Sequence, residues 1–430
     1  TMSPPSSAEH RNDIVGYITA VFGLSQALTA LPLGYFADRL RNGRSRVIAF
    51  GGLITLVASL FNVALILYVG DLTSSRPINL SAFLAAYMVD AFLWGVEGGV
   101  IEGPVEALFA DSTARGKRAL AYTRLETTKL LSYTFGSVLC ALWFQAGDDE
   151  WTIAGMASII LTGVALDGSL FWIMFLFDDE KSLPESEDAE EEPRGGAEDG
   201  ETEPAGPRLP HWFGHRRAMP TILFLSDVVF SLGSGMTVKF FPLYFKNDVG
   251  MSPSEVLYIS ILTPLLLATA YPLAEYVSRF LGAVQTVVLS LVIGLAHFYV
   301  MIIFEESLLT RPYLLVGIYV VRTVFLNVYG PLCTSILMDH VPREERARWQ
   351  GLSSITDFGW CGSAALGGVL ADKYGYAHTF LITAIFQTVG TAGYCLLLPL
   401  VPRTREESTR ENNAEEDPPS REEHANDLEV

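Results

Sequence analysis

The sequence predicts an all-α membrane protein whose helices form two related bundles, and three observations support that prediction. Half of the 430 residues are hydrophobic, only 18% are charged and the mean hydropathy is +0.31, values outside the usual range for a soluble domain. Apolar runs recur along the chain, and each is long enough to cross about 30 Å of hydrocarbon, which takes roughly 20 helical residues. An internal repeat relates the two halves. We therefore predict a polytopic protein of two pseudo-symmetric six-helix bundles.

The apolar runs are predicted to be helices rather than strands. An open strand in lipid would leave its backbone amides and carbonyls without partners, and the runs lack the alternation of period two that indicates a barrel. Eleven spans are predicted to be present, at 14–37, 47–69, 81–109, 119–146, 151–177, 218–245, 254–277, 283–304, 313–338, 349–371 and 377–401.

The negative charge of the chain lies outside these runs. The formal net charge is -19, but 178–203 contains 13 acidic and 2 basic residues and 403–430 contains 10 and 4, so these stretches contribute -11 and -6. Such segments bury too little apolar surface to offset the entropy of ordering. We predict an N-terminal bundle over 1–177, a flexible acidic linker over 178–217, a C-terminal bundle over 218–402 and an acidic tail over 403–430.

The internal repeat fixes the architecture without any alignment. Early in each half a Pro is followed by an Arg seven residues later: Pro32 and Arg39, Pro272 and Arg279. Later in each half an Asp is followed by Arg at the fourth and seventh positions, as Asp111, Arg115 and Arg118 and again as Asp339, Arg343 and Arg346.

The repeat also indicates a gap in the first half. Only 31 residues precede Pro32, whereas about 50 residues separate Pro272 from the start of its half near Pro220. We therefore expect one further span before the first predicted one.

Basic residues predict the orientation. Arginines concentrate in the loops after the first, third and ninth predicted spans, whereas the opposite loops hold one basic residue or none. Because Lys and Arg favour the cytoplasmic side, we expect the linker and the tail to be cytoplasmic.

The loop after the first predicted span contains Gly34, Asp38, Arg39, Gly43 and Arg44. Together with two six-helix halves joined by a long linker, this pattern resembles the major facilitator superfamily over nearly the whole chain. The usual form there is Gly-x-x-x-Asp-Arg-x-Gly-Arg, and this loop has two extra residues before Gly43. The resemblance implies a transporter of a small solute that works by alternating access.

A cytoplasmic gate is the function that we expect of this motif. Gly34 would let two helices approach closely, Asp38 would face a helix amino terminus, and the arginines would pair with acids such as Asp111. The repeat adds the Asp and Arg residues that follow the third and ninth predicted spans. The predicted gate consists of Gly34, Asp38, Arg39, Gly43, Arg44, Asp111, Arg115, Arg118, Asp339, Arg343 and Arg346.

A second copy of the short motif, Gly368 to Gly375 with Asp372 and Lys373, lies after the tenth predicted span. The repeat places it on the side opposite to the gate. We therefore interpret it as a helix end and tight turn.

Ionisable side chains within the predicted spans are candidates for substrate binding or for a specific pair, because each costs about 2.5 to 3.5 kcal/mol to insert. At 100° per residue Asp90 and Glu97 share one helix face. Glu97 and Arg322 lie at nearly the same depth, about 21 and 25 Å from the matching Asp111 and Asp339. We expect them to pair across the cavity or to bind a polar substrate group; a static ion pair or separate neighbours are the alternatives.

Two further carboxylates, Asp227 and Asp357, lie about 12 to 15 Å from a cytoplasmic end. Either can bind a proton, pair with Lys129 or cap a discontinuous helix. Glu102 and Glu106, nearly opposite to Glu97 on their helix, are expected to pair with basic loops.

Transport of a small solute, with or without proton coupling, is the function that the sequence favours. A transporter-like receptor that signals through the linker and tail without net flux is the alternative. We find no phosphate-binding loop, no Gly-x-Ser-x-Gly elbow and no His-Glu-x-x-His motif in the sequence, which argues against an enzyme. We expect a monomer in the lipid bilayer, with no cofactor, metal or nucleic acid.

Overall fold

The structure is a computed structural model, and it describes residues 11–75, 80–113, 118–181, 215–340 and 353–399. Every regular element in these ranges is a helix. In the first half they are α1 (Asn12–Arg39), α2 (Gly43–Ser75), α3 (Leu80–Asp111), α4 (Arg118–Ala146), α5 (Ile153–Ser169) and the 3-10 turns η2 (Phe171–Leu176) and η3 (Asp179–Lys181).

The second half repeats this pattern with more interruptions. Its helices are α7 (His215–Val238), α8 (Phe241–Asn247), α9 (Pro253–Leu281), α10 (Ala283–Ile303), α11 (Glu305–Leu309), α12 (Pro312–Phe325), α13 (Gly330–His340), α15 (Ser353–Tyr374) and α16 (Tyr376–Cys395).

Helices occupy all the ranges in which spans were predicted, but not always as one continuous helix. The predicted span 313–338 breaks between α12 and α13, where α13 starts with Gly330 and Pro331. A Pro is tolerated in the first turn of a helix and ends the helix before it. The span predicted at 218–245 breaks between α7 and α8, and the one at 151–177 finishes in the turn η2.

Eight helical stretches in the described residues are long and apolar enough to cross a membrane. The other three predicted spans are the helices α4, α15 and α16, whose windows contain more polar residues. Their helical structure is therefore confirmed, and their passage through lipid stays a prediction. Large apolar side chains point outward all around the molecule, with Phe135 65% and Ile303 71% exposed, as lipid contact requires.

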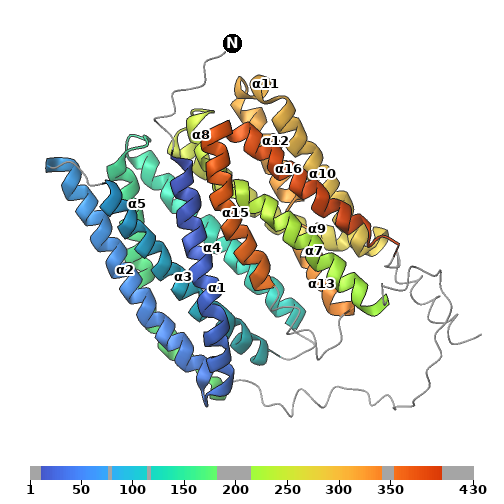
Figure 1. Cartoon of the computed structure of the whole chain (residues 1–430), viewed down its shortest axis with the longest axis horizontal. Coiled ribbons are helices and arrows are strands. Elements are labelled where there is room, and N and C mark those ends of the chain that lie inside the picture. The colour runs from blue at the N-terminus through green and yellow to red at the C-terminus, as the bar shows by residue number, and fades with distance from the viewer. Residues whose placement is uncertain (1–10, 76–79, 114–117, 182–214, 341–352, 400–430) are drawn as a thin grey trace, which may run out of the picture.

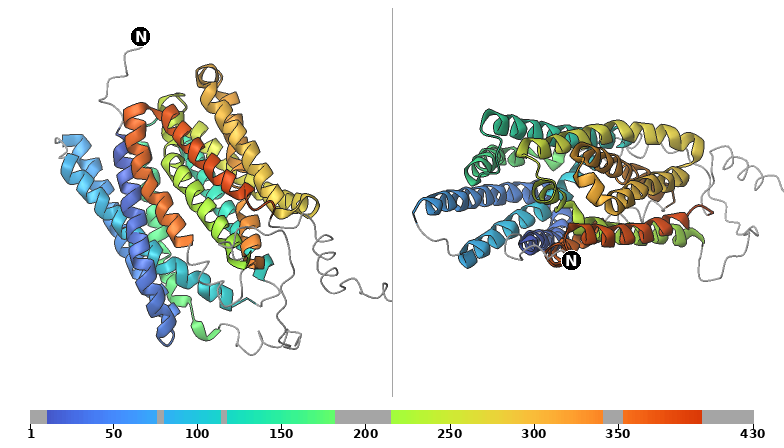
Figure 2. Two further views of the ribbon diagram at one scale, coloured as in Figure 1. Left: turned by 45° about the vertical axis from the view of Figure 1, so that its right-hand side comes forward. Right: turned by 90° about the horizontal axis from the view of Figure 1, so that it is seen from above.

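Successive spans run in alternating directions, so the molecule has two ends (Figures 1 and 2). We call the end where α1 begins the Asn12 end and the end where it finishes the Arg39 end. The α4–α5 and α8–α9 loops lie at the Asn12 end, and η3 lies at the Arg39 end.

Two helix pairs join the first half to the second. Helix α1 packs along α15, and α4 packs along α9. The α1–α15 contact is close because glycines line it: a Cβ at Gly16 would lie 2.5 Å from the Ala364 carbonyl oxygen, and one at Gly368 would lie 2.4 Å from that of Asn12. The backbones therefore touch near the Asn12 end.

The densest apolar core lies in the second half, where Phe241, Phe245, Phe298 and Phe380 are all buried against one another or their neighbours. A separate small cluster of Ala37, Val47 and Val100 lies near the Arg39 end of the first half. Arg322 of the second half is therefore buried next to these rings.

Candidate functional site

Asp90 and Glu97 on α3 both face α2, which confirms that they share one helix face. The Asn62 Nδ2 group donates to Asp90 Oδ2 at 2.7 Å, and the Thr55 hydroxyl donates to Glu97 Oε1 at 3.1 Å. Asp90 is buried, with 4% of its surface exposed. The two carboxylates therefore belong to a polar seam inside the first half.

Arg322 on α12 is buried between aromatic rings. Its guanidinium carbon lies 4.1 Å from the centre of the Phe298 ring and 5.0 Å from that of Phe241. The residue is 4% exposed, and its Nε atom has no hydrogen-bond partner among the described residues. Cation–π contacts with two rings partly replace the lost hydration of the charge.

The expected direct contact between Glu97 and Arg322 is not formed in this structure. Glu97 points to Thr55 within the first half, while Arg322 points to rings within the second half. Depth along the membrane was predicted from residue counts, but the direction of each side chain around its helix axis was not. Their role in substrate binding stays a prediction.

Asp227 on α7 accepts hydrogen bonds from two tyrosines. The hydroxyl groups of Tyr329 and Tyr394 donate to its Oδ1 atom at 3.2 and 3.3 Å. Tyr329 precedes α13 directly, in the break after α12. Asp227 therefore connects α7, α16 and the helix break through side-chain contacts, a network that sequence reasoning did not anticipate.

The opposite face of α3 contacts α1 through Glu102. The Gln26 amide donates to Glu102 Oε2 at 2.8 Å, so the expected pairing of Glu102 with a basic loop is replaced by a contact to α1. Asp357 on α15 lies within electrostatic reach of Glu102, Glu106 and Asp227. Asp357 on α15, the helix that packs along α1, therefore has acidic neighbours in both halves. The shared face of Glu102 and Glu106 was the available signal for this cluster.

The predicted gate motif lies at the Arg39 end and is described only in part. The Arg39 guanidinium lies 4.5 Å from the centre of the Tyr35 ring, and Gly43 is buried at the start of α2. The close helix approach expected at Gly34 is not seen among the described residues, because a Cβ there would meet none of their atoms within 4 Å.

Several gate candidates lie at or beyond the limits of the described residues. Arg115, Arg343 and Arg346 lie outside them. Four more belong to helices, but their side chains are outside the description: Asp38, Asp111, Arg118 and Asp339. Their pairing stays a prediction. No group of three or more His, Cys, Asp or Glu side chains within the described part could hold a metal ion.

A family model matches the chain twice, over residues 3–226 and 223–426, and its description is the Major Facilitator Superfamily. The chain belongs to this superfamily. The two matches correspond to the two halves related by the internal repeat. Membership of the Major Facilitator Superfamily makes the protein an integral, multi-pass membrane transporter of small solutes.

Solved structures with the superfamily fold extend this result. A D-xylose–proton symporter has a TM-score of 0.67 at 12% identity, covering 94% of this chain and 90% of its own. A bacterial homologue of the iron transporter ferroportin, in an inward-facing state, has a TM-score of 0.65 at 14% identity, with 90% and 89% covered. A bacterial homologue of the human lysosomal transporter Spinster scores 0.63 at 13% identity, with 91% and 90% covered. At these identities the likeness shows the superfamily fold alone.

The comparison with curated protein sequences found no significant match.

Proposed function

We propose that this protein moves a small solute across the membrane by alternating access, in which one half rocks against the other about a site between them. The observation that supports it is the pairing of α1 with α15 and of α4 with α9. The repeat relates these two pairs, since α1 corresponds to α9 and α4 to α15. Two equivalent contacts between rigid halves provide an axis for such rocking.

The Arg39 end is proposed to face the cytoplasm, because the arginine-rich loop after α1 lies there and because α3 and α13 end directly before the other two arginine-rich segments of the sequence. In that orientation the acidic linker and tail are cytoplasmic, and the close contacts at the Asn12 end seal the opposite side. The ferroportin homologue supports an inward-facing arrangement: its inward-facing state has a TM-score of 0.65 and its outward-facing state one of 0.58.

Asp357 and the acidic residues near it are proposed as the coupling site. Asp357 has three acidic neighbours within electrostatic reach, among them Asp227. Repulsion between neighbouring carboxylates is relieved when one of them binds a proton or a cationic group of the substrate. Because these acids lie on α3 of one half and on α7 and α15 of the other, the repulsion between them would depend on how the halves are arranged.

Arg322 is proposed to change partners during the cycle. Its guanidinium rests on Phe298 and Phe241 without an acidic partner among the described residues. A desolvated charge in that state is stabilised when an anion reaches it. Glu97, Asp90 or an acidic group of the substrate would supply that anion in another arrangement of the halves.

Flux into proteoliposomes tests the proposed function. The protein would be reconstituted and screened against labelled sugars, amino acids, organic cations and carboxylates at two pH values. Uptake that falls at least tenfold in Asp357→Asn, and not in the exposed Glu275→Gln control, would support the coupling site. Absence of flux for the whole panel with folded protein would favour the receptor alternative.

A further inference from the structure

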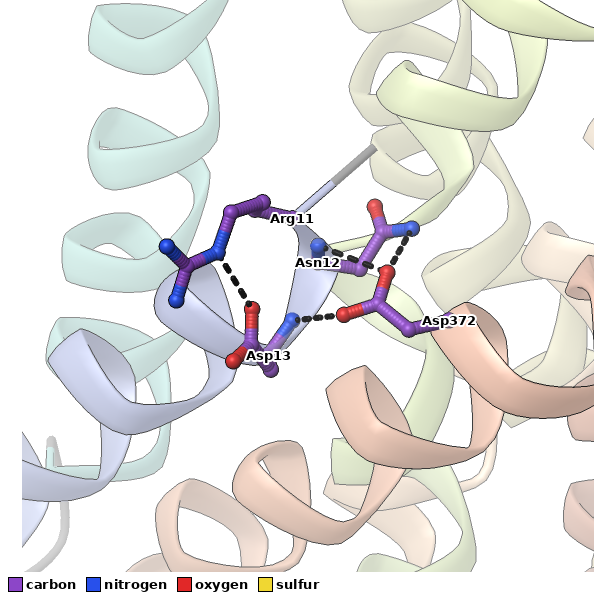
Figure 3. Close-up of polar contacts among 4 residues, drawn as sticks. All are labelled: Arg11, Asn12, Asp13 and Asp372. Atoms are coloured by element: carbon purple, nitrogen blue, oxygen red, sulfur yellow. Dashed lines mark hydrogen bonds and ion pairs between the residues drawn. The ribbon is translucent and has the colours of Figure 1, made fainter. Parts of the chain in front are cut away.

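At the Asn12 end, Asp372 of the second half caps the first helix of the first half. Asp372 lies in the last turn of α15, and its Oδ1 atom accepts hydrogen bonds from the Asn12 backbone amide and the Asn12 side chain, both at 2.8 Å. Its Oδ2 atom accepts from the Asp13 amide at 2.7 Å. Figure 3 shows the carboxylate facing the first backbone amides of α1.

Helix α1 has no cap of its own. Its N-cap residue is Arg11, whose side chain makes no capping hydrogen bond. The first amides of a helix need an acceptor, and a carboxylate there also interacts favourably with the helix dipole. Asp372 supplies this acceptor from the other half of the protein.

Asn12 extends the contact further into the second half. Its Oδ1 atom accepts a hydrogen bond from the Tyr376 hydroxyl at 2.9 Å, and that hydroxyl accepts one from Asn247 at 3.1 Å. Asn12 is 4% exposed. The start of α1 is therefore bound to α8, α15 and α16 together.

In an equivalent contact, the first half supplies the carboxylate and the second half supplies the helix start. Asp149 follows α4 in the first half, and its two carboxylate oxygens accept hydrogen bonds from the Ser254 amide at 3.0 Å and the Ser254 hydroxyl at 2.6 Å. Ser254 lies in the first turn of α9. Nearby, the Trp151 indole donates to the Met251 carbonyl oxygen at 2.8 Å.

The internal repeat relates these two contacts. Asn12 precedes Pro32 by 20 residues, and Ser254 precedes the matching Pro272 by 18. Asp149 follows α4 and Asp372 ends α15, the two helices that the repeat pairs. Each half therefore presents a carboxylate to the corresponding helix start of the other half.

We propose that Asp372 and Asp149 form two reciprocal latches that close the Asn12 end and release each time this end opens. This inference rests on the proposed alternating-access cycle. Opening separates α1 from α15 and α4 from α9, which leaves both carboxylates to water and the α1 amides without their acceptor. The Asp372 latch is the stronger one, because α9 keeps its own capping box of Ser252 and Glu255.

The native thiol of Cys361 reports on the opening. Cys361 is 5% exposed, and its sulfur atom would lie 2.7 Å from a Cβ on Gly23 of α1. We would measure its alkylation by N-ethylmaleimide in the full chain with Cys140, Cys333 and Cys395 replaced by alanine. The assay requires no substrate, so its failure is distinguishable from a failure to transport.

Asp372→Asn is expected to raise the alkylation rate about tenfold, the scale set by losing hydrogen bonds to a charged group. Asp149→Asn should raise it less, and the double variant most. The control is Asp148→Asn, which removes the same charge from the exposed residue beside Asp149. Rates equal to that control in the double variant would overturn the proposal.

A second measurement is needed because Asp372→Asn can disturb α1 locally and expose Cys361 without opening the Asn12 end. In a cysteine-free background, spin labels at Glu150→Cys and Glu306→Cys, two exposed positions of different halves at the Asn12 end, give a distance distribution. Asp149→Asn, which leaves α1 intact, should shift it to longer distances. An unchanged distribution in both single variants and in the double variant would contradict the latches.

Discussion

The guanidinium of Arg322 lies 4.1 Å from the centre of the Phe298 ring, and no hydrogen bond or ion pair found within the described ranges involves it. A buried charge held only by aromatic faces is a poor device for stability, because its desolvation is incompletely offset. Its position among the buried rings of the second half motivates the change of partners proposed above.

Arg322→Met separates these two roles. Replacing a buried charge by an apolar side chain of similar length is often neutral or stabilising by about 1 to 4 kcal/mol, so the melting temperature should stay level or rise. Uptake of a transported substrate should fall at least tenfold. Arg311→Met, at an exposed position, is the control. A large loss of thermal stability in Arg322→Met would show that the charge is structural.

Asp227 and its two tyrosines should behave as one unit. Tyr329→Phe and Tyr394→Phe each remove one hydrogen bond to the same carboxylate oxygen, which should lower the free energy of unfolding by about 1 to 3 kcal/mol. Because the hydroxyls share an acceptor, their effects should not add. A double-mutant cycle in thermal unfolding measures the coupling, and strict additivity would contradict a shared role.

Glycine contacts make a separate prediction about the α1–α15 pair. Gly16→Ala places a methyl group 2.5 Å from the Ala364 carbonyl oxygen, so α1 should move away from α15 and thermal stability should fall. Gly136→Ala on α4 meets nothing within 4 Å, and as a helix-favouring change of about 1 kcal/mol it should leave stability level or raise it. Equal destabilisation of both variants would disprove the close packing.

The α4–α5 loop predicts a pH dependence. Burial acts to raise the pKa of Asp149, but hydrogen bonds from Ser254 and Ser252 outweigh it and hold that pKa below the ordinary 3.8. Because the folded-state pKa of Asp149 is lowered, the stabilisation is complete at pH values above the ordinary pKa. It is lost as pH falls from the ordinary pKa through the folded-state pKa. The difference in melting temperature between wild type and Asp149→Asn should therefore be constant from pH 7 to about pH 5 and shrink below about pH 4. Asp148→Asn is the matched control.

Hydropathy and helical periodicity were sufficient to predict the helices and the shared face of Asp90 and Glu97, because both are local properties of the chain. They could not predict which neighbour a charged side chain faces. Helices that are apolar on every side have no sequence-encoded core face, so the direction of Arg322 depends on the packing of Phe241 and Phe298 around it.

In the second copy of the short motif, Gly368 to Gly375, the local structure was predictable but the partner of the charged side chain was not. Gly375 has a φ of 83° between α15 and α16, which confirms the predicted helix end and tight turn. The partner of Asp372 was not predictable, because Asn12 lies 360 residues away and helix starts are common. Only the spatial arrangement of the two halves brings that helix start to the carboxylate.

The reciprocity of the two caps has a consequence for the symmetry of the molecule. A contact in which the end of one element meets the start of its counterpart, and the reverse, is the pattern of an isologous two-fold interface. Within one chain, α1 with α15 and α9 with α4 reproduce that pattern. The Asn12 end is therefore organised like the interface of a homodimer whose two subunits are joined covalently, and its closing energy divides between two distant points on either side of the two-fold axis.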